Sequence, residues 1–285
     1  MTTTPSRVTV PRFRGRKKIG PPLVMLTAYD VPTALAAEAG GVDAMLVGDS
    51  LANVLLGHDS TLPVTMEEML HHARAVGRVR QRALLIADMP WMSYHVSPED
   101  GVRNAARFVR EAGADAVKVE GGSKRVPTIR AILDAEIPVM GHLGLTPQSV
   151  LCMGGYKVQG RGEEAAQLLV DEAKALDRAG VFAMVLEGMP GEIAARITAE
   201  VDVPTIGIGA GVECDGQVLV FHDLLGMLPG PSPKFVRRYA EIREQQVDAI
   251  RRWADDVRSS SFPSDEETYG SKSDTSAAPG PGSGR

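Results

Sequence analysis

The feature that most constrains the fold is a series of short, almost continuously apolar segments, each followed by a helical pattern or a loop. Seven such segments are clear, and a weaker eighth lies near 217–221. The clear segments cover residues 23–30, 44–50, 84–90, 116–122, 138–144, 184–190 and 205–211. Because they are continuous rather than alternating, they are typical of parallel strands that are buried on both faces.

Helical patterns separate or follow these strands at 67–80, 97–113, 163–180 and 233–257. Thr65 is an N-cap candidate for the first pattern. The second has Ser97 as N-cap, Pro98 in the first position and Gly113 as a stop signal. Repeated βα units of this number and length predict an α/β fold, a (β/α)8 TIM barrel. A doubly wound open sheet is the alternative, and the even succession of units without a sheet reversal favours the barrel.

Composition divides the chain into three parts. Residues 1–20 are expected to form an N-terminal arm, 21–258 the catalytic barrel, and 259–285 a flexible tail rich in Ser, Gly and Pro. No acidic residue precedes Asp30, which is also a property of organellar transit peptides. The prolines of this segment and the strand that begins at Leu23 favour an arm instead.

Charge and cysteine content argue against several classes of protein. The formal net charge is -5, whereas nucleic-acid binding relies on clustered Lys and Arg. No apolar run approaches the ~20 residues that a membrane helix needs, and no secretory signal is recognisable. Cys152 and Cys214 form no metal-ligand spacing and are expected to be reduced thiols. These features predict a cytoplasmic protein without nucleic-acid or membrane partners.

Polar residues stand where the predicted strands end, and barrel enzymes place their chemistry at the carboxyl ends of the strands. These residues are Asp49, Ser50, Asp88, Lys118, Glu120, His142 and Glu187. Asp49 and Asp88 each follow an aliphatic run, so both are expected at the rim of one mouth. Convergent carboxylates that leave positions open suit Mg²⁺, and the lack of a His-rich cluster argues against Zn²⁺. The alternative is that each Asp caps the following helix or turn.

Lys118 and Glu120 are two residues apart on one strand and therefore point to the same side. In the mouth, Lys118 would meet a substrate carboxylate while Glu120 reached the metal or its water. A salt-bridged pair inside the barrel is one alternative. A Schiff-base lysine is another, although it would need a depressed pKa that neighbouring acids oppose.

Glu187 ends the sixth segment and is a candidate general base. Its alternative role is a charge at the start of the next helix. His142 is expected to be a hydrogen-bonded histidine of the core or rim. The glycines of GIGAG (207–211) do not complete a dinucleotide motif, and they end a late strand instead of opening the first βα unit.

Long stretches of the chain resemble the ketopantoate hydroxymethyltransferase family, from about residue 20 to about 265. They are TAYD (27–30), MLVGDSL (45–51), GHDSTLPVT (57–65), ADMP (87–90), VKVEGG (117–122), GHLGLTPQS (141–149), GGYKVQGR (154–161), the 207–220 segment with GIGAG and CDGQVLV, and HDLLG (222–226). The departures are mild: Trp91 and His95 stand where relatives vary, Gly188 follows the candidate base, and the extension past about 270 is additional.

The resemblance implies a barrel similar to those of phosphoenolpyruvate mutase and isocitrate lyase. It implies a Mg²⁺-dependent enzyme, with one ion per subunit, that acts in the first step of pantothenate and coenzyme A biosynthesis. Such an enzyme transfers a hydroxymethyl group from 5,10-methylenetetrahydrofolate to 3-methyl-2-oxobutanoate, giving 2-dehydropantoate and tetrahydrofolate. A homo-oligomer, commonly a decamer, is also implied.

Residue by residue, the resemblance implies that Asp49 and Asp88 bind both metal and substrate, with Glu120 as a further metal-site carboxylate, directly or through water. It implies that Ser50 and Lys118 hold the substrate carboxylate and keto group, and that Glu187 accepts the proton. A Mg²⁺-dependent lyase of the same superfamily is the main alternative. A barrel without enzymatic activity would require that Asp49, Asp88 and Glu187 fail to converge.

Overall fold

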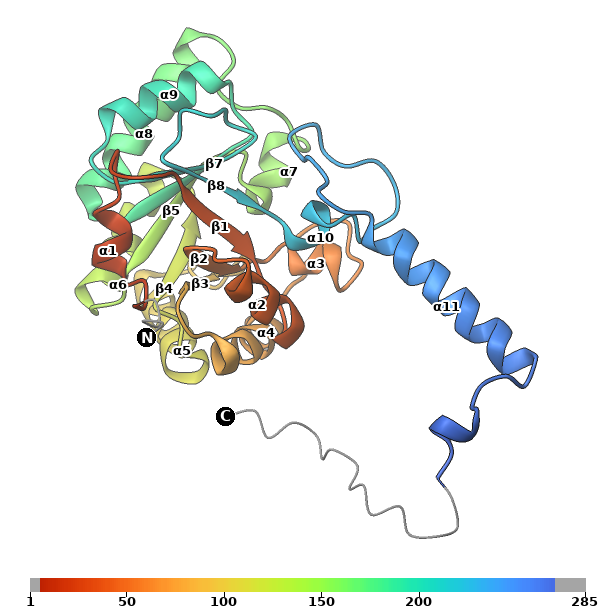
Figure 1. The fold of residues 1–285 in the computed structure, drawn as a ribbon. Helices are drawn as coiled ribbons and strands as arrows, with labels where there is room; N and C mark the ends of the chain where they lie inside the picture. The colour runs from red at the N-terminus through yellow and green to blue at the C-terminus, as the bar shows by residue number, and fades with distance from the viewer. Residues whose placement is uncertain (1–5, 270–285) are drawn as a thin grey trace.

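Eight parallel strands form a closed barrel in chain order in the computed structural model, which describes residues 6–269 (Figure 1). The strands are β1 (Leu23–Thr27), β2 (Ala44–Val47), β3 (Leu84–Asp88), β4 (Ala116–Glu120), β5 (Val139–Gly144), β6 (Ala183–Glu187), β7 (Thr205–Ile208) and β8 (Gly216–Leu219). Because β8 pairs with β1, the barrel is confirmed and the doubly wound sheet is wrong. Residues 1–5 of the predicted arm and 270–285 of the predicted tail lie outside the described residues.

Most of the helices lie around the barrel, and several begin and end where the sequence predicts. They are α1 (Val10–Arg14), α2 (Val31–Ala39), α3 (Leu51–Val54), α4 (Met66–Val79), α5 (Pro98–Ala112), α6 (Val126–Asp134), α7 (Val150–Met153), α8 (Glu163–Ala179), α9 (Gly191–Glu200), α10 (Phe221–Leu224) and α11 (Ile242–Arg258). Thr65 caps α4, and Ser97 caps α5, which stops at the left-handed Gly113. In the described part of the chain, no helix is both long and apolar enough to cross a membrane.

The N-terminal arm closes the barrel at the amino ends of its strands. Phe13 of α1 is fully buried, and its ring meets Phe182 edge-on at 5.9 Å between centroids. Lys17 Nζ lies 2.8 Å from a carboxylate oxygen of Asp215, just before β8, and donates to the Thr198 carbonyl at 2.8 Å. The arm thus belongs to the packed core of the barrel's lower end, and the polar chemistry lies at the opposite, carboxyl end.

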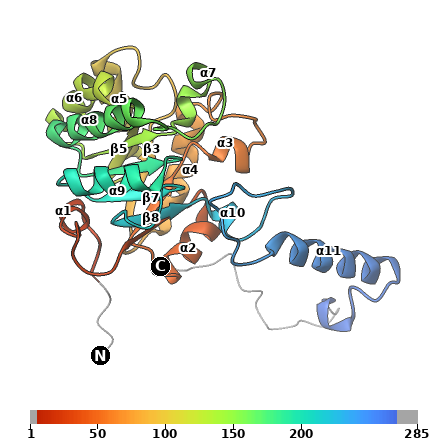
Figure 2. The same ribbon diagram turned by 90° about the horizontal axis from the view of Figure 1, so that it is seen from above.

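The last helix differs from the prediction. It was expected over 233–257 but begins at Ile242, because the preceding segment is held against α10. The Tyr239 and Ile242 amides donate to the Leu224 and Leu225 carbonyls at 2.8 and 3.0 Å. This pairing with α10 replaces helical hydrogen bonds. From Ile242 on, α11 extends away from the barrel in both views (Figures 1 and 2), and none of its residues is buried.

Candidate active site

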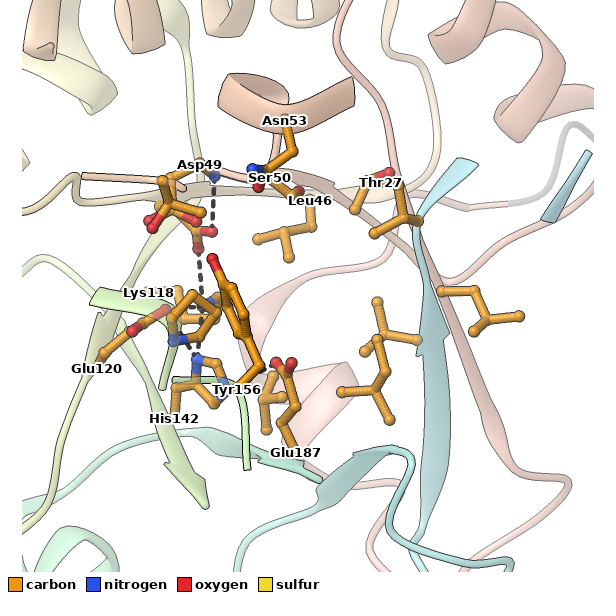
Figure 3. Close-up of a pocket in the computed structure, with 18 of the residues that line it drawn as sticks. Thr27, Leu46, Asp49, Ser50, Asn53, Lys118, Glu120, His142, Tyr156 and Glu187 are labelled. Atoms are coloured by element: carbon orange, nitrogen blue, oxygen red, sulfur yellow. Dashed lines mark hydrogen bonds and ion pairs between the residues drawn. The ribbon is translucent and has the colours of Figure 1, made fainter. Parts of the chain in front are cut away.

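The strand-end residues predicted from the sequence line one cavity of about 300 Å³ at the carboxyl ends of the strands. Asp49, Ser50, Asp88, Lys118, Glu120, His142 and Glu187 all contribute to its wall. Figure 3 shows Glu187 pointing into the cavity on one side, with Lys118, Glu120 and His142 beside it and Asp49 and Ser50 across the opening. Asp49, Asp88 and Glu187 therefore converge on one cavity, which argues against a barrel without enzymatic activity.

The two aspartates at the ends of β2 and β3 are joined directly. The Asp49 amide donates to Asp88 Oδ2 at 3.0 Å, and both side chains are buried. A Cβ at Gly48 would stand 2.8 Å from Ser50 Oγ, so the glycine of VGDS keeps the turn compact. Neither aspartate caps a helix, since Ser50 precedes α3 and Ser97 caps α5. The capping alternative is thus wrong for both.

Lys118 lies within the acidic cluster. Its Nζ is 3.1 Å from Asp88 Oδ1 and 3.7 Å from Glu120 Oε1. Burial alone would lower the pKa of this amine, but Asp88, Glu120 and Asp49 together raise it above its ordinary value. The amine therefore stays a cation, which disfavours the Schiff-base alternative and suits electrostatic binding of an anion.

His142 on β5 links this cluster to Glu187. Its Nδ1 lies 3.2 Å from Glu120 Oε1, and its Nε2 lies 3.2 Å from Glu187 Oε2, although the second pair is not aligned as a hydrogen bond. Burial and Lys118 would lower the imidazole pKa, but Glu120 and Glu187 raise it to about 9. His142 was expected only as a core or rim histidine, and the structure places it between two carboxylates of the cavity.

Glu187 ends β6 and is partly exposed, with 17% of its side chain accessible. It does not start the next helix, since α9 begins at Gly191 after Pro190 without a side-chain cap. Ser50, on the opposite side, is hydrogen-bonded to the Tyr29 hydroxyl at 2.9 Å. The cavity therefore has an accessible carboxylate that faces a buried charged cluster.

The acidic residues have properties that suit a small divalent cation. Burial, followed by Glu120 and Asp88, raises the pKa of Asp49 well above its usual value, and burial also raises the pKa of Asp88. Asp88 Oδ1 is buried without a hydrogen bond, although Lys118 is close. A bound cation would offset the repulsion between these carboxylates and could coordinate to Asp88 Oδ1.

The carboxylates are nevertheless not arranged as a complete set of metal ligands. Among residues 6–269, no three His, Cys, Asp or Glu side chains come together as a metal-binding group. Mg²⁺ commonly binds through one or two carboxylates and keeps several waters or substrate oxygens. Asp49 and Asp88 therefore fit as direct ligands, and Glu120 fits as a ligand through water.

Another part of the cavity wall is apolar. It is formed by Leu46, Val185, Ile208, Val218 and Phe235. Phe235 comes from the segment before α11 and packs over Gly209, where a Cβ would stand 2.9 Å from the ring. One cavity thus offers a charged wall for an anionic group and an apolar wall for an alkyl group.

Three residues near the site were not predicted from the sequence. Gln148 is buried and donates to the carboxylates of Asp49 and Glu120, and the buried Tyr94 is hydrogen-bonded to Gln148 and to the Glu120 backbone. Tyr156 stands across the cavity opening (Figure 3). Gln148 and Tyr156 lie in GHLGLTPQS and GGYKVQGR, two of the stretches that carry the family resemblance. This position in the sequence could have indicated that they belong to the site. No spacing rule connects them to strand ends, because they come from loops.

Solved structures with the same fold are barrels of the phosphoenolpyruvate mutase and isocitrate lyase superfamily. Phosphonopyruvate hydrolase in complex with oxalate and Mg²⁺ matches with a TM-score of 0.59 and 17% identity, over 91% of this chain and 93% of that chain. 2,3-Dimethylmalate lyase matches with a TM-score of 0.55 and 18% identity, over 87% of each chain. At these identities the likeness concerns the fold alone.

Sequence relatives are much closer. The 3-methyl-2-oxobutanoate hydroxymethyltransferase of Koribacter versatilis is 57% identical over 93% of this chain and 90% of that protein. The protein of the same name from Moorella thermoacetica is 54% identical over 93% and 98%. The family model described as ketopantoate hydroxymethyltransferase matches residues 7–265. With this match and these identities, the chain belongs to the ketopantoate hydroxymethyltransferase family.

Proposed function

We propose that this chain transfers a hydroxymethyl group from 5,10-methylenetetrahydrofolate to 3-methyl-2-oxobutanoate, giving 2-dehydropantoate and tetrahydrofolate. The observation that carries the proposal is the shared cavity, in which Glu187 faces a buried cluster of Asp49, Asp88, Lys118 and Glu120 beside an apolar wall. A small branched 2-oxo acid has the matching parts: a carboxylate, a keto oxygen and an isopropyl group. The product feeds pantothenate and coenzyme A biosynthesis.

The proposed cofactor is one Mg²⁺ per subunit, held by Asp49 and Asp88, with Glu120 reaching it through water. When bound, the ion supplies Lewis-acid stabilisation of negative charge on the keto oxygen, worth several kcal/mol. The donor set is all oxygen, as Mg²⁺ prefers. Asp88 Oδ1, which is buried beside Lys118 without a hydrogen bond, supports this assignment.

The protein's own groups then have separate tasks. Ser50 and Lys118 hold the substrate carboxylate and keto group, while the apolar wall receives the isopropyl group. Glu187 removes the proton from C3, and the Lys118 ammonium stabilises the resulting negative charge. C3 then attacks the methylene carbon of the folate, whose bond to one folate nitrogen breaks, and that nitrogen takes up the proton removed from C3. Water replaces the second folate nitrogen on the methylene carbon: its oxygen becomes the product hydroxyl, and its hydrogen goes to that nitrogen, giving tetrahydrofolate. Asp59 and Thr61 of the 57–65 loop line the cavity, and closure of this loop would exclude bulk water until that step.

Loss of deuterium from C3-labelled 3-methyl-2-oxobutanoate, with Mg²⁺ but without folate, tests the proposal. Exchange that disappears with EDTA supports metal-dependent proton removal, and a folate requirement for net turnover separates the transferase from a carbon–carbon lyase. If no exchange occurs even with a folate analogue bound, the substrate assignment is wrong.

We also propose that the chain forms a homo-oligomer through α11, a decamer as the family resemblance implies. Val247, Ile250, Trp253 and Val257 share one face of this helix, and Ile250 and Trp253 are 61% and 56% exposed. An apolar groove of about 400 Å³ lies on the barrel wall between α2 and β8, lined by residues that include Leu26, Leu219, Phe221 and Leu225. α10, which follows β8, has only four residues and leaves this wall open.

The expected occupant of the groove is α11 of a second copy. Native mass spectrometry should give an oligomer for the full chain and smaller species for Ile250→Asp/Trp253→Asp. The matched control is Asp248→Ala on the exposed polar face of α11. If the double variant assembles with the same concentration dependence as the unmodified chain, α11 does not form the contact between copies.

The proposed location is the cytoplasm, where Cys152 and Cys214 stay as free thiols.

A further inference from the structure

The buried amide of Gln148 joins two carboxylates of the candidate metal site. Its Nε2 donates to Asp49 Oδ2 at 2.8 Å and to the Met89 carbonyl at 3.0 Å. Its backbone amide donates to Glu120 Oε2 at 3.0 Å. The residue is only 6% exposed. One residue from the loop after β5 therefore holds one oxygen of Asp49 and one oxygen of Glu120.

The orientation of this amide is fixed by its neighbours. The Tyr94 hydroxyl lies 2.6 Å from Gln148 Oε1 and accepts from the Glu120 amide at 3.2 Å, so its own proton is available for Oε1. On the other side, Asp49 and the Met89 carbonyl both require a donor, which only the NH₂ end can supply. A flipped amide would lose both donated hydrogen bonds and place its oxygen beside two other acceptors, Asp49 Oδ2 and the Met89 carbonyl.

The consequence concerns which oxygens face the cavity. Among the hydrogen bonds of residues 6–269, Asp49 Oδ2 is engaged by Gln148, and Oδ1 is not engaged. The same division holds for Asp88, whose Oδ2 accepts from the Asp49 amide while Oδ1 has no hydrogen bond. Each aspartate thus has one oxygen that is hydrogen-bonded to the protein and one that is not, and the second oxygen of Asp88 lies 3.1 Å from Lys118 Nζ.

We propose that Gln148, held in its orientation by Tyr94, is a positioning residue that sets the carboxylates of Asp49 and Glu120 for the cation. The proposal rests on the metal site proposed above. Groups that orient metal ligands in this way typically change metal affinity by about 10- to 100-fold when they are removed. Gln148 acts through the carboxylates and need not touch the substrate.

The test is Mn²⁺ binding to the full-length protein, measured by the electron paramagnetic resonance signal of free Mn²⁺ without substrate. Gln148→Met keeps the length of the side chain but removes the amide, and should weaken Mn²⁺ binding by about 10- to 100-fold. Tyr94→Phe keeps the ring and should weaken it by about tenfold. If Tyr94 acts through Gln148, the double variant should bind Mn²⁺ no worse than Gln148→Met alone.

The matched control is Asn104→Leu. Asn104 Nδ2 donates to the Ser93 carbonyl at 2.7 Å, so this change also removes a partly buried amide near Tyr94, but the amide does not contact a carboxylate. The control should leave Mn²⁺ affinity within about twofold, whereas a general loosening of the fold would lower it in all variants. Thermal melting identifies any variant that is not folded, and Tyr94→Phe carries the test if Gln148→Met fails to fold.

The outcomes separate the two proposals. Absence of Mn²⁺ binding by the unmodified chain would overturn the metal site itself. Unmodified protein that binds Mn²⁺ and exchanges C3 deuterium, together with folded Gln148 and Tyr94 variants of unchanged affinity, would overturn only the positioning role. Additive losses in the double variant would show that Tyr94 does not act through Gln148.

Discussion

His142 stands between Glu187 and Glu120, with its two ring nitrogens 3.2 Å from a carboxylate oxygen of each. The candidate base is therefore not isolated from the acidic cluster but lies one imidazole ring away from it. A cationic ring in this position offsets the charge of both carboxylates, against the opposing charge of Lys118, whose Nζ lies 3.0 Å from His142 Nδ1. Glu187 lies beside the ring, on the side of the cavity that faces the charged wall.

Replacing Glu187 with Gln removes the proton acceptor while keeping the shape of the side chain. We expect the rate of C3 deuterium exchange to fall by about 10²- to 10⁴-fold, the usual contribution of a general base. Mn²⁺ affinity should stay unchanged, because Glu187 is not among the proposed ligands. Exposed Glu192 on α9 offers a matched control, and Glu192→Gln should exchange normally. Exchange at the normal rate in Glu187→Gln would assign the base to another group.

The raised pKa of His142 predicts a pH dependence of stability in the metal-free protein. Its folded pKa of about 9 lies above the unfolded value of 6.5, so the stabilisation is complete below pH 6.5 and is lost as the pH rises through 9. A difference of this size corresponds to roughly 3 kcal/mol. Urea unfolding in EDTA between pH 6 and 10 should show this loss, and His142→Gln should flatten it. Equal pH profiles for both proteins would mean that the imidazole is neutral throughout.

The ion pair between Lys17 and Asp215 predicts a large effect on stability far from the active site. The Asp215 side chain is 4% exposed and also accepts from the Thr205 amide at 2.9 Å. Asp215→Ala would leave the Lys17 ammonium and this amide without their partner, so we expect a loss of about 3 kcal/mol in the free energy of unfolding. Asp100→Ala, which breaks an exposed ion pair with Arg103, should change it by less than about 1 kcal/mol. Similar losses in both variants would show that burial of the pair is unimportant.

Much of the fold could be predicted because its signals are local. The apolar runs and the caps at Thr65, Ser97 and Gly113 lie in consecutive residues, and the structure has strands and helix ends at these places. The start of the last helix was wrong because tertiary hydrogen bonds to the Leu224 and Leu225 carbonyls decide it. Such contacts leave no periodic pattern in the sequence.

The site was predictable to the extent that barrel topology determines it. Residues at strand ends converge whatever their loops do, so Asp49, Asp88 and Glu187 could be placed in one mouth from their positions alone. The roles of Gln148 and His142 depend on side-chain orientation and on loop paths between distant elements. Hydrogen bonds such as that between Gln148 and Asp49 are visible only in three dimensions.

The segment before α11 links the wall of the cavity to a helix that extends away from the barrel. Phe235 forms part of the apolar wall, and α11 begins a few residues later at Ile242. If α11 binds a neighbouring copy as proposed, a ligand that shifts Phe235 changes the free energy of that binding, and the reverse effect must be equal in size. Occupancy of the cavity and association of subunits would then be thermodynamically linked through one short stretch of chain. Ligand affinity would depend on protein concentration, as it does for any protein whose subunits share such a segment.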